Sequence, residues 1–123
     1  MNRYNNYLSI RREVLEQNAR AVMDYIKVPV IGVVKMDGYG MGVVEAAKVW
    51  LEAGVSMLAV AEPWEALAIR EAGIETDILL MAPVADREIF ISLLEKNVIF
   101  TVSGLIIVLV VKKHRRQHKD GER

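Results

Sequence analysis

One lysine stands where a predicted buried strand runs into a glycine-rich turn. The strand reads Val-Pro-Val-Ile-Gly-Val-Val over residues 28–34, and Lys35 follows it directly. An amine at the exit of a buried strand is partly desolvated, and such an amine can form a Schiff base with a carbonyl compound. The turn, residues 36–42, contains Tyr39 and three glycines, whose backbone amides we expect to be open to a phosphate. Together these features predict a pyridoxal phosphate site.

The segment around this lysine resembles a known family motif. Residues 32–42 read Gly-Val-Val-Lys-Met-Asp-Gly-Tyr-Gly-Met-Gly. They closely resemble the cofactor-lysine motif of the pyridoxal-phosphate-dependent alanine racemases, Val-Val-Lys-Ala-Asn-Ala-Tyr-Gly-His-Gly. Residues 51–61 and 65–81 resemble the family's second and third repeats. The resemblance covers most of residues 10–103 in an unbroken register and does not cover the C-terminal tail.

The resemblance implies a role for several individual residues. Lys35 corresponds to the lysine that holds pyridoxal 5'-phosphate as an internal aldimine and exchanges the substrate's α-proton on one face. Tyr39 corresponds to a tyrosine near the cofactor phosphate. Val33 and Met81 correspond to apolar positions that line the cofactor pocket. Met41 stands where the family usually has histidine, which alters local hydrogen bonding but not the lysine chemistry. No metal site is expected.

Three functions remain open. The leading one is a pyridoxal-phosphate-dependent amino-acid racemase or its N-terminal fragment, which acts on alanine or on serine and supplies D-alanine for peptidoglycan precursors. By resemblance, the intact enzyme is a homodimer. The second is a catalytically incomplete fragment that only binds the cofactor or a partner chain. In the family, the base of the opposite face lies beyond the fourth strand, so this chain alone is expected to be inactive. The third is a small tail-anchored membrane protein.

Alternating strand and helix patterns predict the elements that position the lysine. Leu15, Asn18, Val22 and Ile26 recur at helical spacing and predict the first helix. Further helices are marked by Val43 to Leu51, Pro63 to Ala72 and Asp86 to Leu94, with Gly54 and Gly73 as stop signals, and strands are predicted at 28–34, 57–61, 78–81 and 98–102.

Such alternation is typical of βαβ units and a parallel sheet. The fold class is therefore α/β, and residues 1–103 are predicted to be the N-terminal part of a pyridoxal-phosphate-binding (β/α)₈ barrel with about four βα units. A complete barrel of this kind typically needs about 250 residues. An open partial barrel exposes a strand edge and apolar surface, so we expect a marginally stable, partnered or aggregation-prone domain.

Other side chains near the predicted site have structural explanations. Glu62 and Glu65 lie three apart at a predicted helix start, where acids favour the helix dipole, so capping is preferred over a catalytic pair. Asp37 is expected to shape the turn. Trp50 and Trp64 fall on predicted apolar helix faces and are expected in the core or at an interface.

The last twenty residues differ from the rest. Residues 104–111 are continuously apolar, and from residue 112 onward there are six Lys or Arg against two Asp or Glu. A frameshift or a misassembled gene end would explain the change. The apolar stretch 98–111 is shorter than the about 20 residues needed to span a bilayer, so a membrane anchor is not expected. Nucleic-acid binding is not expected either, because no aromatic residues interleave the basic ones.

Composition sets the outer bounds. With 123 residues, 53% of them hydrophobic, the chain is one domain at most and can form a core. The absence of cysteine excludes disulfides and thiolate metal sites and fits a cytoplasmic location. The polar N-terminus, residues 1–7, lacks the apolar segment of a signal peptide, so secretion is not expected.

Overall fold

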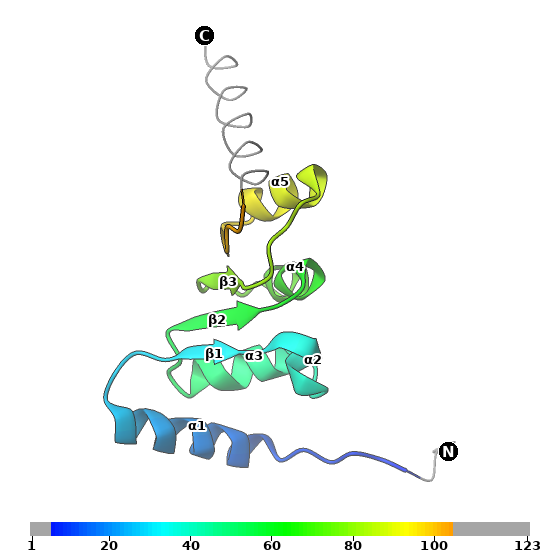
Figure 1. Ribbon diagram of the computed structural model, residues 1–123. Helices are drawn as coiled ribbons and strands as arrows, with labels where there is room; N and C mark the ends of the chain where they lie inside the picture. The colour runs from blue at the N-terminus through cyan, green and yellow to red at the C-terminus, as the bar shows by residue number, and fades with distance from the viewer. Residues whose placement is uncertain (1–5, 105–123) are drawn as a thin grey trace.

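The computed structural model describes residues 6–104, which form one parallel sheet with helices packed along it (Figure 1). The predicted α/β class is confirmed. In chain order the elements are α1 (Arg12–Ile26), β1 (Ile31–Val33), α2 (Lys35–Tyr39), α3 (Val43–Glu52), β2 (Met57–Val60), α4 (Pro63–Glu71), β3 (Ile78–Leu80), α5 (Arg87–Glu95) and β4 (Val98–Phe100).

The four strands are parallel and lie in the order of the chain, β1-β2-β3-β4. One row of the register runs through Val33, Ala59, Leu79 and Ile99. Helix α3 contacts both α1 and α4, and α4 also contacts α5, so the helices follow one another alongside the strands. Within residues 6–104 the four parallel strands, with α3, α4 and α5 between them, match the predicted partial barrel.

The core lies between the sheet and the helices. Leu58, Leu80, Ile69 and Leu93 have no exposed surface, and they come from alternate strand positions and from the inner sides of α4 and α5. The intervening strand positions point to the opposite face, because successive side chains alternate across a strand. On that face Ile31 and Ile99 are 48% and 42% exposed. The apolar surface expected of an open partial barrel is therefore present.

Strand β1 is shorter than predicted. The sequence pattern indicated a strand over residues 28–34, whereas β1 covers Ile31–Val33. Pro29 has no N–H to donate to a ladder, and the first backbone contact to the neighbouring segment runs from Ser56 N to Val30 O at 3.1 Å. The strand therefore begins after the proline and ends where the Lys35 turn begins.

Helix α1 is present as predicted, but three of the four residues that predicted it lie outside its contact face. Asn18, Val22 and Ile26 are exposed, and α1 has no fully buried residue. Charged groups hold the helix to α3 in part: Arg12 pairs with Glu45 and Glu52, and Arg20 donates to the Glu52 carbonyl at 2.6 Å. The half-buried side chains of α1 are Arg12, Val14, Leu15, Glu16, Ala19 and Met23.

The predicted start and stop signals of the later helices are confirmed. The Asp86 carboxylate accepts a hydrogen bond from Ile89 N at 2.9 Å and caps α5. Pro63 is the first residue of α4. Gly54 and Gly73 have φ values of 102° and 78°, as expected of glycines just past a helix end.

The two tryptophans differ in burial. Trp50 packs half-buried against the core, whereas Trp64 is 49% exposed and so is not a core residue. Within residues 6–104 no helix has the length and apolar character needed to cross a bilayer. The tail beyond residue 104 lies outside the described residues.

Arg70 ties two loops together at the amino ends of the strands. Its guanidinium donates to four backbone carbonyls, and burial lowers its pKa, an effect that Asp77 and Glu75 oppose. The carbonyls belong to Ile74 and Thr76 before β3 and to Lys96 and Asn97 before β4, at 2.7–3.1 Å. One side chain of α4 thus fixes where both following strands begin.

We expect Arg70→Lys to lower the free energy of unfolding by about 2–3 kcal/mol, because an ammonium group cannot reach all four carbonyls and hydrogen bonds from charged donors are strong. Urea denaturation followed by circular dichroism measures the loss. The matched control is Arg20→Lys, whose 52% exposed side chain makes an ion pair with Glu16 and one bond to a carbonyl, that of Glu52, so we expect a loss below about 1 kcal/mol. Equal losses in the two variants would contradict the role of Arg70.

Candidate active site

Lys35 lies directly after the carboxyl end of β1, at the start of the turn. A Cβ atom on Gly32 would meet Val55 and Trp50, so position 32 points toward the helices. Side chains alternate along a strand, which directs Val33 to the opposite, open face. The Lys35 side chain is half-buried. The predicted catalytic lysine is therefore at the exit of the strand, beside the uncovered apolar surface.

Met81 follows β3 at the register position that corresponds to Lys35 after β1. The ladders continue past the assigned strands, since Val34 N donates to Ala59 O and Met81 N donates to Val60 O, both at 2.8 Å. In this register Val33 pairs with Ala59, and Ala59 pairs with Leu79. Lys35 and Met81 each come two residues after the member of this row in their own segment. The structure thus brings Val33 and Met81 to the carboxyl end of the sheet, beside the turn that Lys35 begins.

Tyr39 is placed differently. It is the last residue of α2, and its side chain is 56% exposed. It belongs to the turn that starts at Lys35, so its direction depends on the conformation of that turn.

The turn after Lys35 has an uncommon backbone. Residues 36–40 follow one another with φ values of 55°, 55°, 62°, 55° and 85°, so five successive residues are left-handed. Two of them, Gly38 and Gly40, are glycines. Each of the other three costs on the order of 1–2 kcal/mol in this conformation. Contacts around the turn must offset that cost.

The glycine amides of the turn are not open to a phosphate, and this prediction is wrong. Gly38 N donates to Val34 O at 2.9 Å, and Gly42 N donates to Asp37 O at 2.9 Å. Gly40 N lies 3.1 Å from the carbonyl oxygens of both Met36 and Asp37. A left-handed turn closes its own hydrogen bonds, which the glycine spacing alone does not reveal.

Asp37 connects the turn to two helices. Its carboxylate Oδ1 accepts a hydrogen bond from Val43 N, the first residue of α3, at 2.8 Å. Its own backbone N donates to Glu65 Oε1 at the start of α4, at 2.9 Å. The expectation that Asp37 shapes the turn is confirmed, and the residue also anchors the turn to the amino ends of α3 and α4.

Glu65 does more than the predicted capping. Its Oε2 atom accepts from Ala61 N at 3.0 Å and from Glu62 N at 2.9 Å, which confirms a capping role at the start of α4. The side chain has no exposed surface, and the bond from Asp37 reaches it from 28 residues away. The local pattern Glu-Pro-Trp-Glu indicates only the cap, so sequence reasoning missed this long-range contact.

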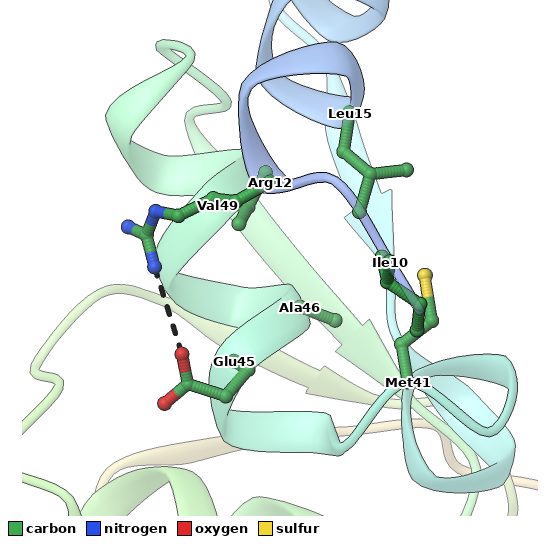
Figure 2. A pocket seen from close by; sticks show the side chains of 7 residues that line it. All are labelled: Ile10, Arg12, Leu15, Met41, Glu45, Ala46 and Val49. Atoms are coloured by element: carbon green, nitrogen blue, oxygen red, sulfur yellow. Dashed lines mark ion pairs between the residues drawn. The ribbon is translucent and has the colours of Figure 1, made fainter. Parts of the chain in front are cut away.

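A hollow of about 210 Å³ lies beside the turn, between the N-terminal segment, α1 and α3 (Figure 2). Met41 lines it next to Ile10, and the ion pair between Arg12 and Glu45, at 3.5 Å, lies at its side. The residue that replaces the motif's histidine thus contributes to an apolar contact under α1. Its full lining is Ile10, Arg12, Leu15, Met41, Glu45, Ala46 and Val49.

Comparison with known proteins identifies the family. The family model described as "Alanine racemase, N-terminal domain" matches residues 10–122, most of the chain. The chain belongs to the alanine racemase family. The alanine racemase of Methanococcus maripaludis is 41% identical over 87 residues, which are 71% of this chain and 23% of that protein.

Solved alanine racemases share the fold. The enzyme from Bacillus anthracis superposes with a TM-score of 0.69 at 38% identity and covers 74% of this chain and 24% of its own. The enzyme from E. faecalis gives a TM-score of 0.77 at 27% identity, with 85% and 29% covered. The predicted partial barrel is thereby confirmed.

The chain spans about a quarter of the length of the curated alanine racemases that it matches. The family match runs to residue 122, past residue 103, where the resemblance read from the sequence ended. The division of the chain at residues 103 and 104 stays a prediction.

The left-handed turn predicts a difference between two glycines. A Cβ on Gly38 would lie 2.8 Å from the Ala46 Cβ, whereas one on Gly40 would meet nothing within 4 Å, although both have positive φ. We expect Gly38→Ala to lower the free energy of unfolding by about 2–4 kcal/mol, from strain and overpacking together.

The matched variant Gly40→Ala should lose only about 1–2 kcal/mol, the cost of the backbone conformation alone. Urea unfolding of the two variants under the same conditions measures both values. A Gly40→Ala loss as large as that of Gly38→Ala would show that the turn does not pack on Ala46 as described.

Proposed function

We propose that this chain is the N-terminal, lysine-bearing part of a pyridoxal-phosphate-dependent alanine racemase that acts in the cytoplasm. The observation that carries the proposal is the place of Lys35: a half-buried lysine directly after the carboxyl end of β1 in a parallel sheet. Barrels built from such units place their chemistry at this end. The family of the chain supports the same reaction class.

The residues present fit part of the cofactor. Lys35 Nζ would hold it covalently, and the half-buried Val33 and Met81 offer apolar surface at the carboxyl ends of β1 and β3. Because the glycine amides of the turn are already hydrogen-bonded, the phosphate would depend on side chains, with the Tyr39 hydroxyl as the candidate from this turn. When bound, pyridoxal phosphate supplies an electron sink for deprotonation at the substrate Cα.

Lys35 contributes one half of the proton exchange. Its amine would take or return the α-proton on the face that it occupies, while racemisation also needs an acid or base on the other face. We assign that second group to the part of the full-length enzyme that this chain does not cover. We also assign to that part the contacts that distinguish alanine from serine and those that form the proposed homodimer.

Alanine is the proposed substrate. The Bacillus anthracis enzyme, 38% identical over the matched region, was solved with bound L-Ala-P, which supports an alanine-like ligand for this chain. Serine remains the alternative, and activity measured on the two amino acids with the full-length enzyme separates them.

Titration of the purified chain with pyridoxal phosphate tests the assignment of Lys35. We expect an absorbance band near the visible edge that is lost in Lys35→Ala, since no other lysine within residues 6–104 shares its place at the strand exit. Borohydride reduction and mass spectrometry should then locate the cofactor on the peptide that contains Lys35. Lys48→Ala is the control, because Lys48 is an exposed lysine paired with Glu45 and should leave the band unchanged. A band that persists in Lys35→Ala would refute the assignment.

The purified 123-residue chain should not form D-alanine from L-alanine above the level of Lys35→Ala, even with the cofactor added. The reason is that a single lysine serves one face only. A coupled D-amino-acid oxidase assay measures the product. Robust D-alanine formation would show that the chain supplies both faces by itself.

A further inference from the structure

Glu65 is the one charged residue among the described side chains that is fully buried. Burying a carboxylate is costly unless it is hydrogen-bonded, and here three backbone N–H groups meet its two oxygens. Two of these donors, Ala61 and Glu62, belong to the start of its own helix and share Oε2. The third, Asp37 N, belongs to the turn after Lys35 and has Oε1 to itself.

The two carboxylate oxygens of Glu65 therefore have different roles: Oε2 caps the start of α4, and Oε1 binds the turn after Lys35. A glutamate at this position of a helix needs only one oxygen to cap it. The second oxygen holds a residue whose φ of 55° lies in the left-handed region. The bonds that close the turn from within, such as Gly38 N to Val34 O, span a few residues only. Glu65 holds the turn from another βα unit.

The turn has Lys35 at its start and Tyr39 at its end. Whatever fixes its left-handed conformation also fixes the directions in which these two side chains leave the backbone. The Asp37 carboxylate holds the same turn to Val43 at the start of α3, so the turn is fixed between two helix ends, by one contact within its own unit and one outside it.

We propose that Glu65 is a positioning residue for the cofactor site: through the Asp37 amide it holds the left-handed turn that aims Lys35 and Tyr39, without touching the cofactor. The cofactor part of this inference rests on the proposed function. The part about the turn can be measured on the chain with nothing bound.

Glu65→Gln is the first test variant. A glutamine keeps one acceptor oxygen and turns the other into an NH₂ donor. The oxygen keeps more hydrogen bonds by staying with Ala61 and Glu62, which leaves the NH₂ group facing Asp37 N. Glu62→Gln is the matched control, because it makes the same exchange at the same helix end on an exposed side chain.

NMR of the full chain without cofactor gives the first readout. In Glu65→Gln we expect the Asp37 amide proton to move upfield, and the three-bond couplings that report φ at Asp37 and Tyr39 to depart from their left-handed values. Glu62→Gln should leave both unchanged. If Glu65→Gln gives no dispersed spectrum, Glu65→Asp replaces it, since the shorter carboxylate stays near its own helix start but withdraws from Asp37.

Pyridoxal phosphate affinity, followed by the Lys35-dependent band, gives the second readout. We expect Glu65→Gln to weaken it at least about tenfold, the factor for losing one hydrogen bond to a charged group, and Glu62→Gln to change it less than about twofold. Adding Met36→Gly should recover most of the loss, because glycine adopts the left-handed conformation without strain and the Met36 side chain is 68% exposed.

Three results would overturn the proposal: couplings that stay left-handed without the Glu65 carboxylate, an equal loss of affinity in Glu62→Gln, or no recovery with Met36→Gly. If the unsubstituted chain shows no Lys35-dependent band, the proposed function fails instead. The couplings in the free chain then still decide whether Glu65 holds the turn.

Discussion

The site depends on a single backbone constraint, the left-handed turn between β1 and α3. It reverses the chain within the residues that separate the two elements, and it begins at the lysine that carries the predicted chemistry. Such a turn is unfavourable for the three non-glycine residues in it, so it persists only because the surrounding structure stabilises it. Asp37 supplies this support by donating to one helix start and accepting from another. Local strain at the site is thus offset by contacts between successive βα units.

The sheet that carries this turn has two unlike faces. One is covered by helices and holds the fully buried side chains, while the other presents Ile31 and Ile99 to solvent. In a closed barrel the second face lines the interior and is packed with side chains. Lys35 directly follows the strand that borders this face, so closure of a barrel would bring apolar groups near its amine and lower the polarity around it.

Much of this architecture could be predicted from sequence because its signals are local. The alternation of strand and helix, the Asp86 cap and the glycines after helix ends each depend on a few neighbouring residues. The errors concern long-range contacts. The exposed side of α1 could not be recognised without knowing which side of the helix meets α3, and the closed hydrogen bonds of the glycine turn depend on five consecutive left-handed residues. The bond from Asp37 to Glu65 joins residues 28 apart, and a glutamate that reads as a cap gives no sign of it.

The order of the strands along the chain has a consequence for how this region is made. Each strand pairs only with its predecessor and its successor, and register partners such as Val33 and Ala59 are no more than 26 residues apart. Short separations keep the entropy cost of closing each loop low and favour rapid folding. The sheet can therefore grow one βα unit at a time as the polypeptide leaves the ribosome. On this route the glutamate of the second unit reaches the lysine turn of the first as soon as two units have been synthesised, before the remaining strands exist.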